Sequence, residues 1–169
     1  MGSRQNLLVF LSLFTSAIFA ATLQAADEPK DLDEVPKAVM DSLKAKFADA
    51  KITKWSKETE NGKVVYDIEF KLKGRKAEAD IAEDGTVLSY EKEFDAKDLP
   101  KAVTDSLEKK YPKAKMKEVM EITEVRGKRE IHGGFEIVID TADKKEVELT
   151  IAKDGKILED STEKKAEKK

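Results

Sequence analysis

The 169-residue sequence offers few side chains that could carry out covalent chemistry. It contains no cysteine and one histidine, His132, which excludes thiol catalysis, disulfides and cysteine-bearing zinc sites. A serine nucleophile would need a base beside it, but Ser42 and Ser106 occupy repeated helix positions typical of a solvated face. We therefore expect no catalytic residue, no cofactor and no enzymatic activity.

Alternating carboxylates form the first candidate binding site. Glu136 and Asp140 would lie beside Glu146 and Glu148 on the outward face of two paired strands. Adjacent carboxylates can bind a cation or a basic protein surface, although alternating charge is also what a water-facing sheet shows. Since the sequence has no calcium-loop motif, we predict no metal site, and a small-ligand or cation-binding sensor is the alternative function.

An insertion in the second half of the chain is the next candidate. It runs from residue 125 to residue 134, contains three glycines, and is locally basic through Arg126, Lys128, Arg129 and His132. Loops on a rigid sheet often carry recognition. We therefore expect the insertion either to contact a partner or simply to lengthen a hairpin with an exposed tip.

Three aromatic residues, Trp55, Tyr90 and Phe94, do not fit the apolar pattern of the strands. Trp55 is out of phase with Ile52, which indicates a bulge or a place on the outer face. An aromatic there could anchor a partner, whereas such residues more often close the edge of a core.

An internal duplication positions these residues. Residues 35–47 and 99–111 share eight identities at an offset of 64 residues, set by Pro36 and Pro100. The Asp-Gly pairs that begin at residues 84 and 154 lie 70 residues apart, so the second copy carries about six more residues. The mature chain is therefore a tandem repeat, which we place at residues 30–94 and 95–160.

Each copy begins with a helical pattern and continues with period-two alternation. Apolar residues four apart form one helical stripe, and each helix begins at a proline. The segments that follow alternate apolar and polar residues between Gly-containing turns. The predicted fold is α+β, with two repeats that each pack a short helix on one face of an antiparallel sheet of about four strands. Whether the two sheets join stays open.

The two ends differ from the repeats. Arg4 precedes an apolar run from Leu7 to Ala21 and small residues up to Ala26, which predicts a signal peptide over residues 1–25. The charged residues 161–169 have nothing to bury, so a disordered tail is expected. The formal net charge is −3 with finely mixed signs, which argues against nucleic acid as a partner. We expect an exported protein, periplasmic or secreted, with no stable membrane insertion after cleavage.

The motifs of both copies resemble those of the PepSY-like proteins grouped with the β-lactamase inhibitor protein fold. The residues that carry the resemblance are Leu99-Pro100, Val103, Tyr111-Pro112-Lys113-Ala114-Lys115 and Asp154-Gly155 in the second copy, with Val35-Pro36, Phe47-Ala48-Asp49-Ala50-Lys51 and Asp84-Gly85 in the first. The first copy departs by lacking the proline of Tyr-Pro. The resemblance implies a helix-on-sheet fold, export, and binding or inhibition of a protein through a sheet surface.

The favoured function is therefore a non-enzymatic, exported binding protein. Its partner would be another secreted or envelope protein, with inhibition of a peptidase or a β-lactamase as one version. The outward sheet positions and the 125–134 insertion are the predicted contact surfaces.

Overall fold

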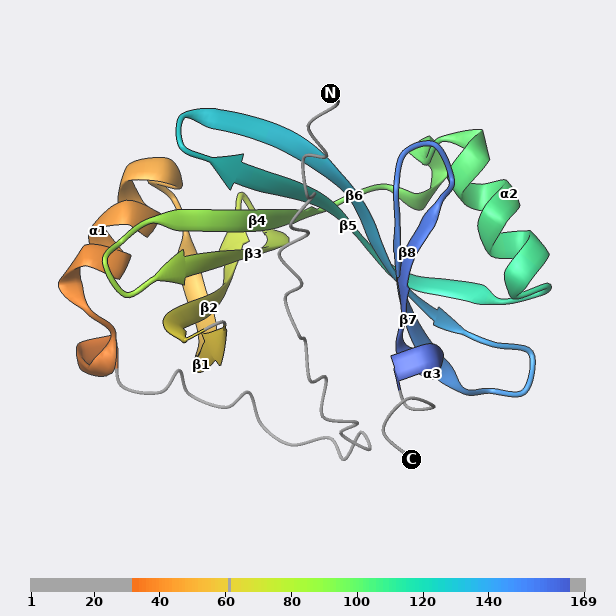
Figure 1. The fold of residues 1–169 in the computed structure, drawn as a ribbon, viewed down its shortest axis with the longest axis horizontal. Coiled ribbons are helices and arrows are strands. Elements are labelled where there is room, and N and C mark those ends of the chain that lie inside the picture. Colours follow the sequence, from red (N-terminus) through yellow and green to blue (C-terminus); the bar gives the residue numbers. More distant parts are fainter. Residues whose placement is uncertain (1–31, 61, 165–169) are drawn as a thin grey trace, which may run out of the picture.

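The computed structural model describes residues 32–60 and 62–164 of the chain. The predicted signal peptide, Asn61 and residues 165–169 lie outside the described residues. The described chain forms one 8-stranded antiparallel sheet whose strands follow the order of the sequence (Figure 1). The strands are β1 (Lys51–Glu60), β2 (Lys63–Leu72), β3 (Arg75–Ala82), β4 (Val87–Glu93), β5 (Lys115–Arg126), β6 (Arg129–Asp140), β7 (Glu146–Ile151) and β8 (Ile157–Asp160).

Helices precede each group of four strands. The α-helices α1 (Lys37–Lys46) and α2 (Lys101–Lys110) follow the short 3-10 helices η1 (Leu32–Glu34) and η2 (Ala96–Asp98). The predicted α+β architecture is confirmed: α1 belongs with β1–β4 and α2 with β5–β8. The strands of the two repeats join in one sheet, because β4 pairs with β5 from Ser89↔Glu124 to Glu93↔Met120.

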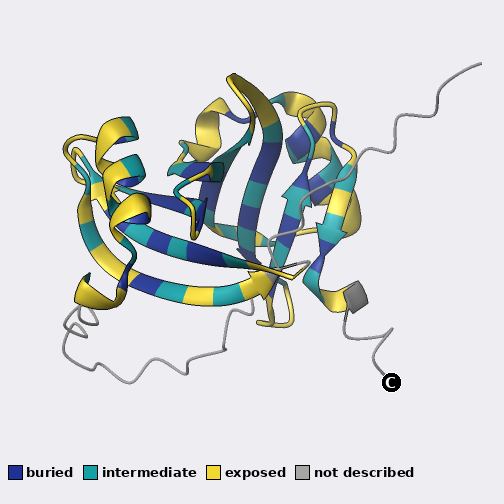
Figure 2. Cartoon of the chain, turned by 60° about the vertical axis from the view of Figure 1, so that its left-hand side comes forward, coloured by how far each residue is buried: buried dark blue, intermediate teal, exposed yellow. Residues whose placement is uncertain are grey.

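Two separate cores lie under the two helices. In the first core, Val39 and Leu43 of α1 and Phe47, which follows the helix, pack against Ile68 and Phe70 of β2. The second core places Val103 and Leu107 of α2 over the inward residues of β6 and β7. Buried and half-buried positions alternate along much of β2 and β7 (Figure 2). The helical stripe and the period-two alternation therefore meet as the sequence predicts, because each element buries its one apolar face.

The repeated Asp-Gly turns pack against the helices. A Cβ atom on Gly85 would lie 2.8 Å from the carbonyl oxygen of Ala38 and 2.9 Å from Ser42 Oγ. A Cβ atom on Gly155 would lie 2.4 Å from the carbonyl oxygen of Ala102 and 2.8 Å from Ser106 Oγ. The expectation that both serines lie on a solvated face is therefore wrong, because the turn of each repeat covers them and leaves them half-buried.

Substitution of Gly155 by alanine tests this close contact. Gly155 and Gly127 both have a positive φ, of 87° and 64°, but a Cβ atom added at Gly127 would meet no atom within 4 Å. Gly127→Ala should cost about 1 kcal/mol of unfolding free energy from backbone strain alone. Gly155→Ala should cost about 2–4 kcal/mol, because the helix must also move away. Urea unfolding of both variants measures the difference, and equal losses would contradict the packing argument.

The end of the described chain differs from the predicted disordered tail. Ser161–Lys164 form the short helix α3. The side chain of Asp160 accepts a hydrogen bond from the backbone N–H of Thr162 at 2.8 Å, and Ser161 Oγ accepts one from the backbone N–H of Glu148 at 3.0 Å. These local bonds order the first turn of a segment that has nothing apolar to bury. Within residues 32–60 and 62–164, no helix is both long and apolar enough to cross a membrane.

Candidate functional site

One face of the sheet points away from both helices, and we call it the outer face. The register places its residues in rows across the strands, so the side chain at each position has a known neighbour on the next strand. Glu69 of β2 lies opposite Glu78 of β3, which in turn lies opposite Glu91 of β4. Asp67 lies opposite Asp80 in the adjacent row. Like charges placed directly opposite each other destabilise a sheet.

The outer face carries carboxylates on strands of both repeats. We call the following set the acidic cluster: Asp67, Glu69, Glu78, Asp80, Glu91, Glu136 and Glu148. Electrostatic repulsion links members on strands that are not paired, since Glu136 of β6 repels Glu78 of β3 and Glu91 of β4. The cluster therefore extends across the β4–β5 junction.

The outer face is not a flat, solvated surface. Met120 and Val65, which both point to this face, are 1% and 2% exposed. Lys76 of β3 donates a hydrogen bond to Glu118 of β5 at 2.7 Å, passing over β4. The twist of the sheet (Figure 1) brings together side chains from strands that do not pair. Residues that a flat sheet would expose to water are therefore buried among one another.

Burial raises the pKa of several members of the cluster. Loss of hydration and repulsion from Asp80 and Glu78 raise the pKa of Asp67 to about 7. Loss of hydration, with Glu148 as the main repelling group, raises the pKa of Glu136 to about 8. The pKa of Glu91 lies well above its ordinary value because of burial and repulsion from Glu136. Desolvation disfavours the charged form of a carboxyl group, and neighbouring negative charge adds to that effect.

Some members of the cluster have positive or hydroxyl partners. Lys54 donates a hydrogen bond to Glu69 at 2.9 Å, and Lys76 forms an ion pair with Glu78 at 2.7 Å. Glu91 differs from them: it is 7% exposed, and its Oε2 atom accepts no hydrogen bond from the described residues. Asp67 Oδ1 is likewise buried and accepts no hydrogen bond from the described residues. A buried carboxylate oxygen without a partner costs free energy in the folded state.

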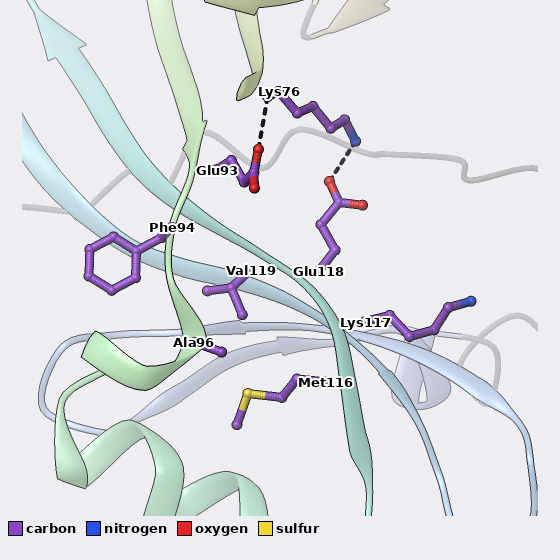
Figure 3. A pocket seen from close by; sticks show the side chains of 8 residues that line it. All are labelled: Lys76, Glu93, Phe94, Ala96, Met116, Lys117, Glu118 and Val119. Carbon is purple, nitrogen blue, oxygen red and sulfur yellow. Dashed lines mark hydrogen bonds and ion pairs between the residues drawn. The ribbon is translucent and has the colours of Figure 1, made fainter. Parts of the chain in front are cut away.

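A pocket of about 360 Å³ opens where β4 leaves β5 (Figure 3). One wall is charged and consists of Lys76, Glu93 and Glu118, and the other is apolar and consists of Phe94, Met116 and Val119. Lys76 joins this pocket to the acidic cluster, because its ammonium group contacts both Glu118 and Glu78 at 2.7 Å.

The 125–134 insertion forms the far end of the β5–β6 hairpin. Arg126 pairs with Arg129 around a two-residue turn, and Arg126, Lys128, Arg129 and His132 are exposed. The hairpin also contacts the first repeat, since Glu130 accepts a hydrogen bond from Tyr90 Oη at 2.9 Å and pairs with Lys46 of α1. His132 lies 3.2 Å from Glu121 and stacks edge-on against Phe135. The insertion thus lengthens a hairpin, as one of the two expectations states, and holds the repeats together.

Trp55 does not lie on the outer face. A register shift between Ile52 and Lys54 turns Trp55 inward, where it is 6% exposed and lies 6.1 Å from the ring of Tyr66. The bulge interpretation is confirmed, and the suggestion of an outer-face anchor is wrong because the extra residue restores the inward phase. Tyr90 is likewise in the first core, and Phe94 packs against the second.

The carboxylates named from the sequence separate into two groups. Glu136 and Glu148 join the acidic cluster, whereas Asp140 and Glu146 pair at the far end of β6 and β7, where Lys117 lies 3.9 Å and 2.6 Å from them. Sequence reasoning missed Glu91 as a site residue. The alternation of the strand could have identified it, because Glu91 lies two residues from both Ser89 and Glu93 and therefore shares their face. That face also holds Glu69 and Glu78.

The cluster does not have the geometry of a metal site. Among residues 32–60 and 62–164, no three carboxylate or histidine side chains converge closely enough to hold a metal ion. The carboxylates are instead spread along and across the strands, with apolar residues between them.

Comparison with known proteins gives a family and a fold. The family described as β-lactamase-inhibitor-like, PepSY-like matches residues 27–89 and 65–159. A β-lactamase-inhibitor-protein-like structure from Bacteroides fragilis is 22% identical with a TM-score of 0.51, covering 74% of this chain and 84% of its own. A structure described as a periplasmic protein from Bacteroides eggerthii is 15% identical with a TM-score of 0.59, covering 75% and 87%.

A third structure, from Bacteroides uniformis and of a domain family without an assigned function, is 16% identical with a TM-score of 0.57. It covers 74% of this chain and 87% of its own. No protein of curated function matches this sequence. The structural likenesses agree on the fold.

Proposed function

Because this chain belongs to the β-lactamase-inhibitor-like, PepSY-like family, we propose that it is an exported binding protein that recognises a secreted or envelope protein through its outer face. The protein would carry no catalytic activity of its own and would act by occupying a surface of its partner. Inhibition of a peptidase or a β-lactamase is one version of this function. The apolar run at the N-terminus and the periplasmic description of a structural neighbour support export.

The observation that carries the proposal is the electrostatic cost of the acidic cluster. Glu69, Glu78 and Glu91 face one another in a row across three strands, an arrangement of like charges that destabilises a sheet. Natural sequences tend to keep such unfavourable arrangements at functional sites and compensate for them elsewhere. A partner that supplies positive charge would remove this repulsion on binding. The relief of the repulsion would then add to the free energy of binding.

The proposal is tested by crosslinking the full chain in the cells that export it. Three variants separate the candidate surfaces: Glu91→Gln with Glu136→Gln for the outer face, Lys128→Ala with Arg129→Ala for the hairpin tip, and Glu83→Gln as a control in the exposed β3–β4 turn. We expect one protein to be captured by the unchanged chain and by the control, and to be lost with the outer-face pair.

Capture that is equal for all variants would contradict the use of the outer face. Loss confined to the hairpin pair would move the contact surface to the insertion. If crosslinking captures no protein while calcium gives a thermal shift that magnesium does not, the result would favour the alternative of a cation-binding sensor.

A further inference from the structure

Glu91 is the most unusual member of the acidic cluster. It lies on β4, the strand that joins the two repeats, and is only 7% exposed to solvent. Its Oε2 atom accepts no hydrogen bond within the described chain. The groups that act most strongly on Glu91 are Glu136 from β6, Glu78 and Asp80 from β3, and Glu148 from β7, and all four are acidic. The neighbouring Lys76 is already held between Glu78 and Glu118, so Glu91 itself has no cationic partner among its contacts in the described chain.

Apolar side chains lie beside Glu91 and beside the carboxylates of the second repeat. Across the strand pairs, Glu91 lies opposite Ile122, Glu136 lies opposite Met120, and Glu148 lies opposite Val138. Met120 is fully buried, and Ile122 and Val138 are half-buried. The site therefore offers apolar surface beside its carboxylates at Ile122 and at Val138, with Met120 filling the space beneath.

This combination matches the chemistry of lysine and arginine side chains. Their aliphatic stems pack on apolar surface while the charged head group lies at a polar edge. A metal ion binds oxygen ligands and would gain nothing from contact with the apolar residues. Among residues 32–60 and 62–164, no three acidic or histidine side chains converge closely enough to hold a metal ion. The positions from β3 to β7 span four strand spacings, or about 19 Å, which about six residues of extended chain would cover.

We propose that the outer face binds an extended basic segment of its partner protein, with one lysine or arginine side chain seated between Glu91 and Glu136 against the half-buried side chains of Ile122 and Val138. This inference rests on the proposed function and gives the partner a chemical class. Glu78 and Glu69 already pair with lysines of this chain, so Glu91 of β4 and Glu136 of β6 provide the anchoring charge. The flanking basic residues of the segment would lie along Glu148 and Asp80.

The test uses oligolysine as the probe and titration calorimetry of the full exported chain at about pH 9, above the pKa of about 8 of Glu136 and below the ordinary pKa of lysine. Oligolysine should bind, oligoglutamate should not, and the affinity should fall with added salt because exposed charges are screened. Glu91→Gln should weaken oligolysine binding by about tenfold or more, since a buried charge loses its partner. Glu83→Gln should leave the affinity unchanged within about twofold.

A measurement of folding separates binding from structure in the same variant. Glutamine keeps the shape of Glu91 and removes its charge, so Glu91→Gln should raise the melting temperature while it weakens binding. If Glu91→Gln lowers the melting temperature and also weakens oligolysine binding, Glu91 has a purely structural role and the proposal is overturned. Equal oligolysine affinities for the unchanged chain and Glu91→Gln would overturn it as well.

Two further measurements test whether a metal ion or the C-terminal segment of this chain occupies the site instead. Saturable calcium binding that Glu91→Gln abolishes, without oligolysine binding, would assign the site to a metal ion. A chain ending at Lys164 that binds oligolysine about tenfold more tightly than the full chain would assign the site to the lysines of residues 165–169. If oligolysine fails to bind but crosslinked capture still depends on Glu91 and Glu136, the proposed function stands and only the basic segment is rejected.

Discussion

Lowering the pH from 8 to 5 should raise the free energy of unfolding of this protein. Asp67 and Glu136 have pKa values of about 7 and about 8 in the folded chain, against ordinary values of about 4 when the chain is unfolded. A carboxyl with a raised pKa holds its proton more tightly in the folded state. Its contribution to stability is complete below the unfolded pKa and is lost as the pH rises through the folded pKa.

The expected gain is on the order of 3–5 kcal/mol, since one unit of pKa difference corresponds to about 1.4 kcal/mol and the groups repel one another. Asp160 limits the gain at the acid end. Burial opposes the shift, but hydrogen bonds from Lys110, Thr162 and Tyr111 outweigh it and lower the pKa of Asp160 to about 2. That contribution is present above about pH 4 and is lost as the pH falls towards 2. Stability should therefore be greatest near pH 4–5.

Urea unfolding at a series of pH values measures this profile. The control is a chain with Asp67→Asn and Glu136→Gln, whose profile between pH 5 and 8 should be much flatter, because two of the groups that titrate there are absent. A profile of the unchanged chain that is flat, or that rises with pH over this range, would contradict the description of the outer face.

Truncation of the equivalent leucine in either helix should destabilise the whole chain. Leu43 and Leu107 are 1% and 4% exposed and occupy matching positions in the two cores. Leu43→Ala and Leu107→Ala should each cost about 2–5 kcal/mol, from lost burial and from the cavity left behind. Because β4 pairs with β5 and the β5–β6 hairpin contacts α1, each substitution should lower one shared transition rather than melt one repeat alone.

Thermal unfolding followed by circular dichroism and by the fluorescence of Trp55 checks this expectation. Trp55 reports on the first core, so in the Leu107→Ala chain both signals should change at the same lowered temperature. Leu158→Ala serves as the control, because Leu158 is 38% exposed and its truncation should change the free energy by less than about 1 kcal/mol. A Trp55 transition that stays at its original temperature in Leu107→Ala would show that the repeats unfold independently.

The parts of the fold that follow from local pattern could be predicted from the sequence. The helical stripe of Val39, Leu43 and Phe47, and its copy in α2, depend only on the spacing of apolar residues. The pairing of Glu136 with Thr150 and of Asp140 with Glu146 follows from the alternation and the turn between the strands. These features require no knowledge of distant contacts.

The features that sequence reasoning missed all depend on how the strands approach one another. The burial of Glu91 requires β4 to pair with β5 and the sheet to twist, and neither leaves a signal in the local pattern. The place of Trp55 stayed open between a bulge and the outer face, because it depends on a single extra residue in β1. The contact of Glu130 with Lys46 joins residues 84 positions apart. The candidate site was therefore only partly visible, as the outward carboxylates Glu136 and Glu148.

Carboxyl-carbon NMR during titration with oligolysine tests most directly whether the outer face is the binding surface. The side-chain carboxyl signals of Glu78, Glu91 and Glu136 should shift together as the probe is added, while those of Glu83 and Glu108, which lie away from the outer face, should stay in place. Shifts confined to exposed carboxylates such as Glu83 and Glu108, with Glu91 and Glu136 unmoved, would contradict the account.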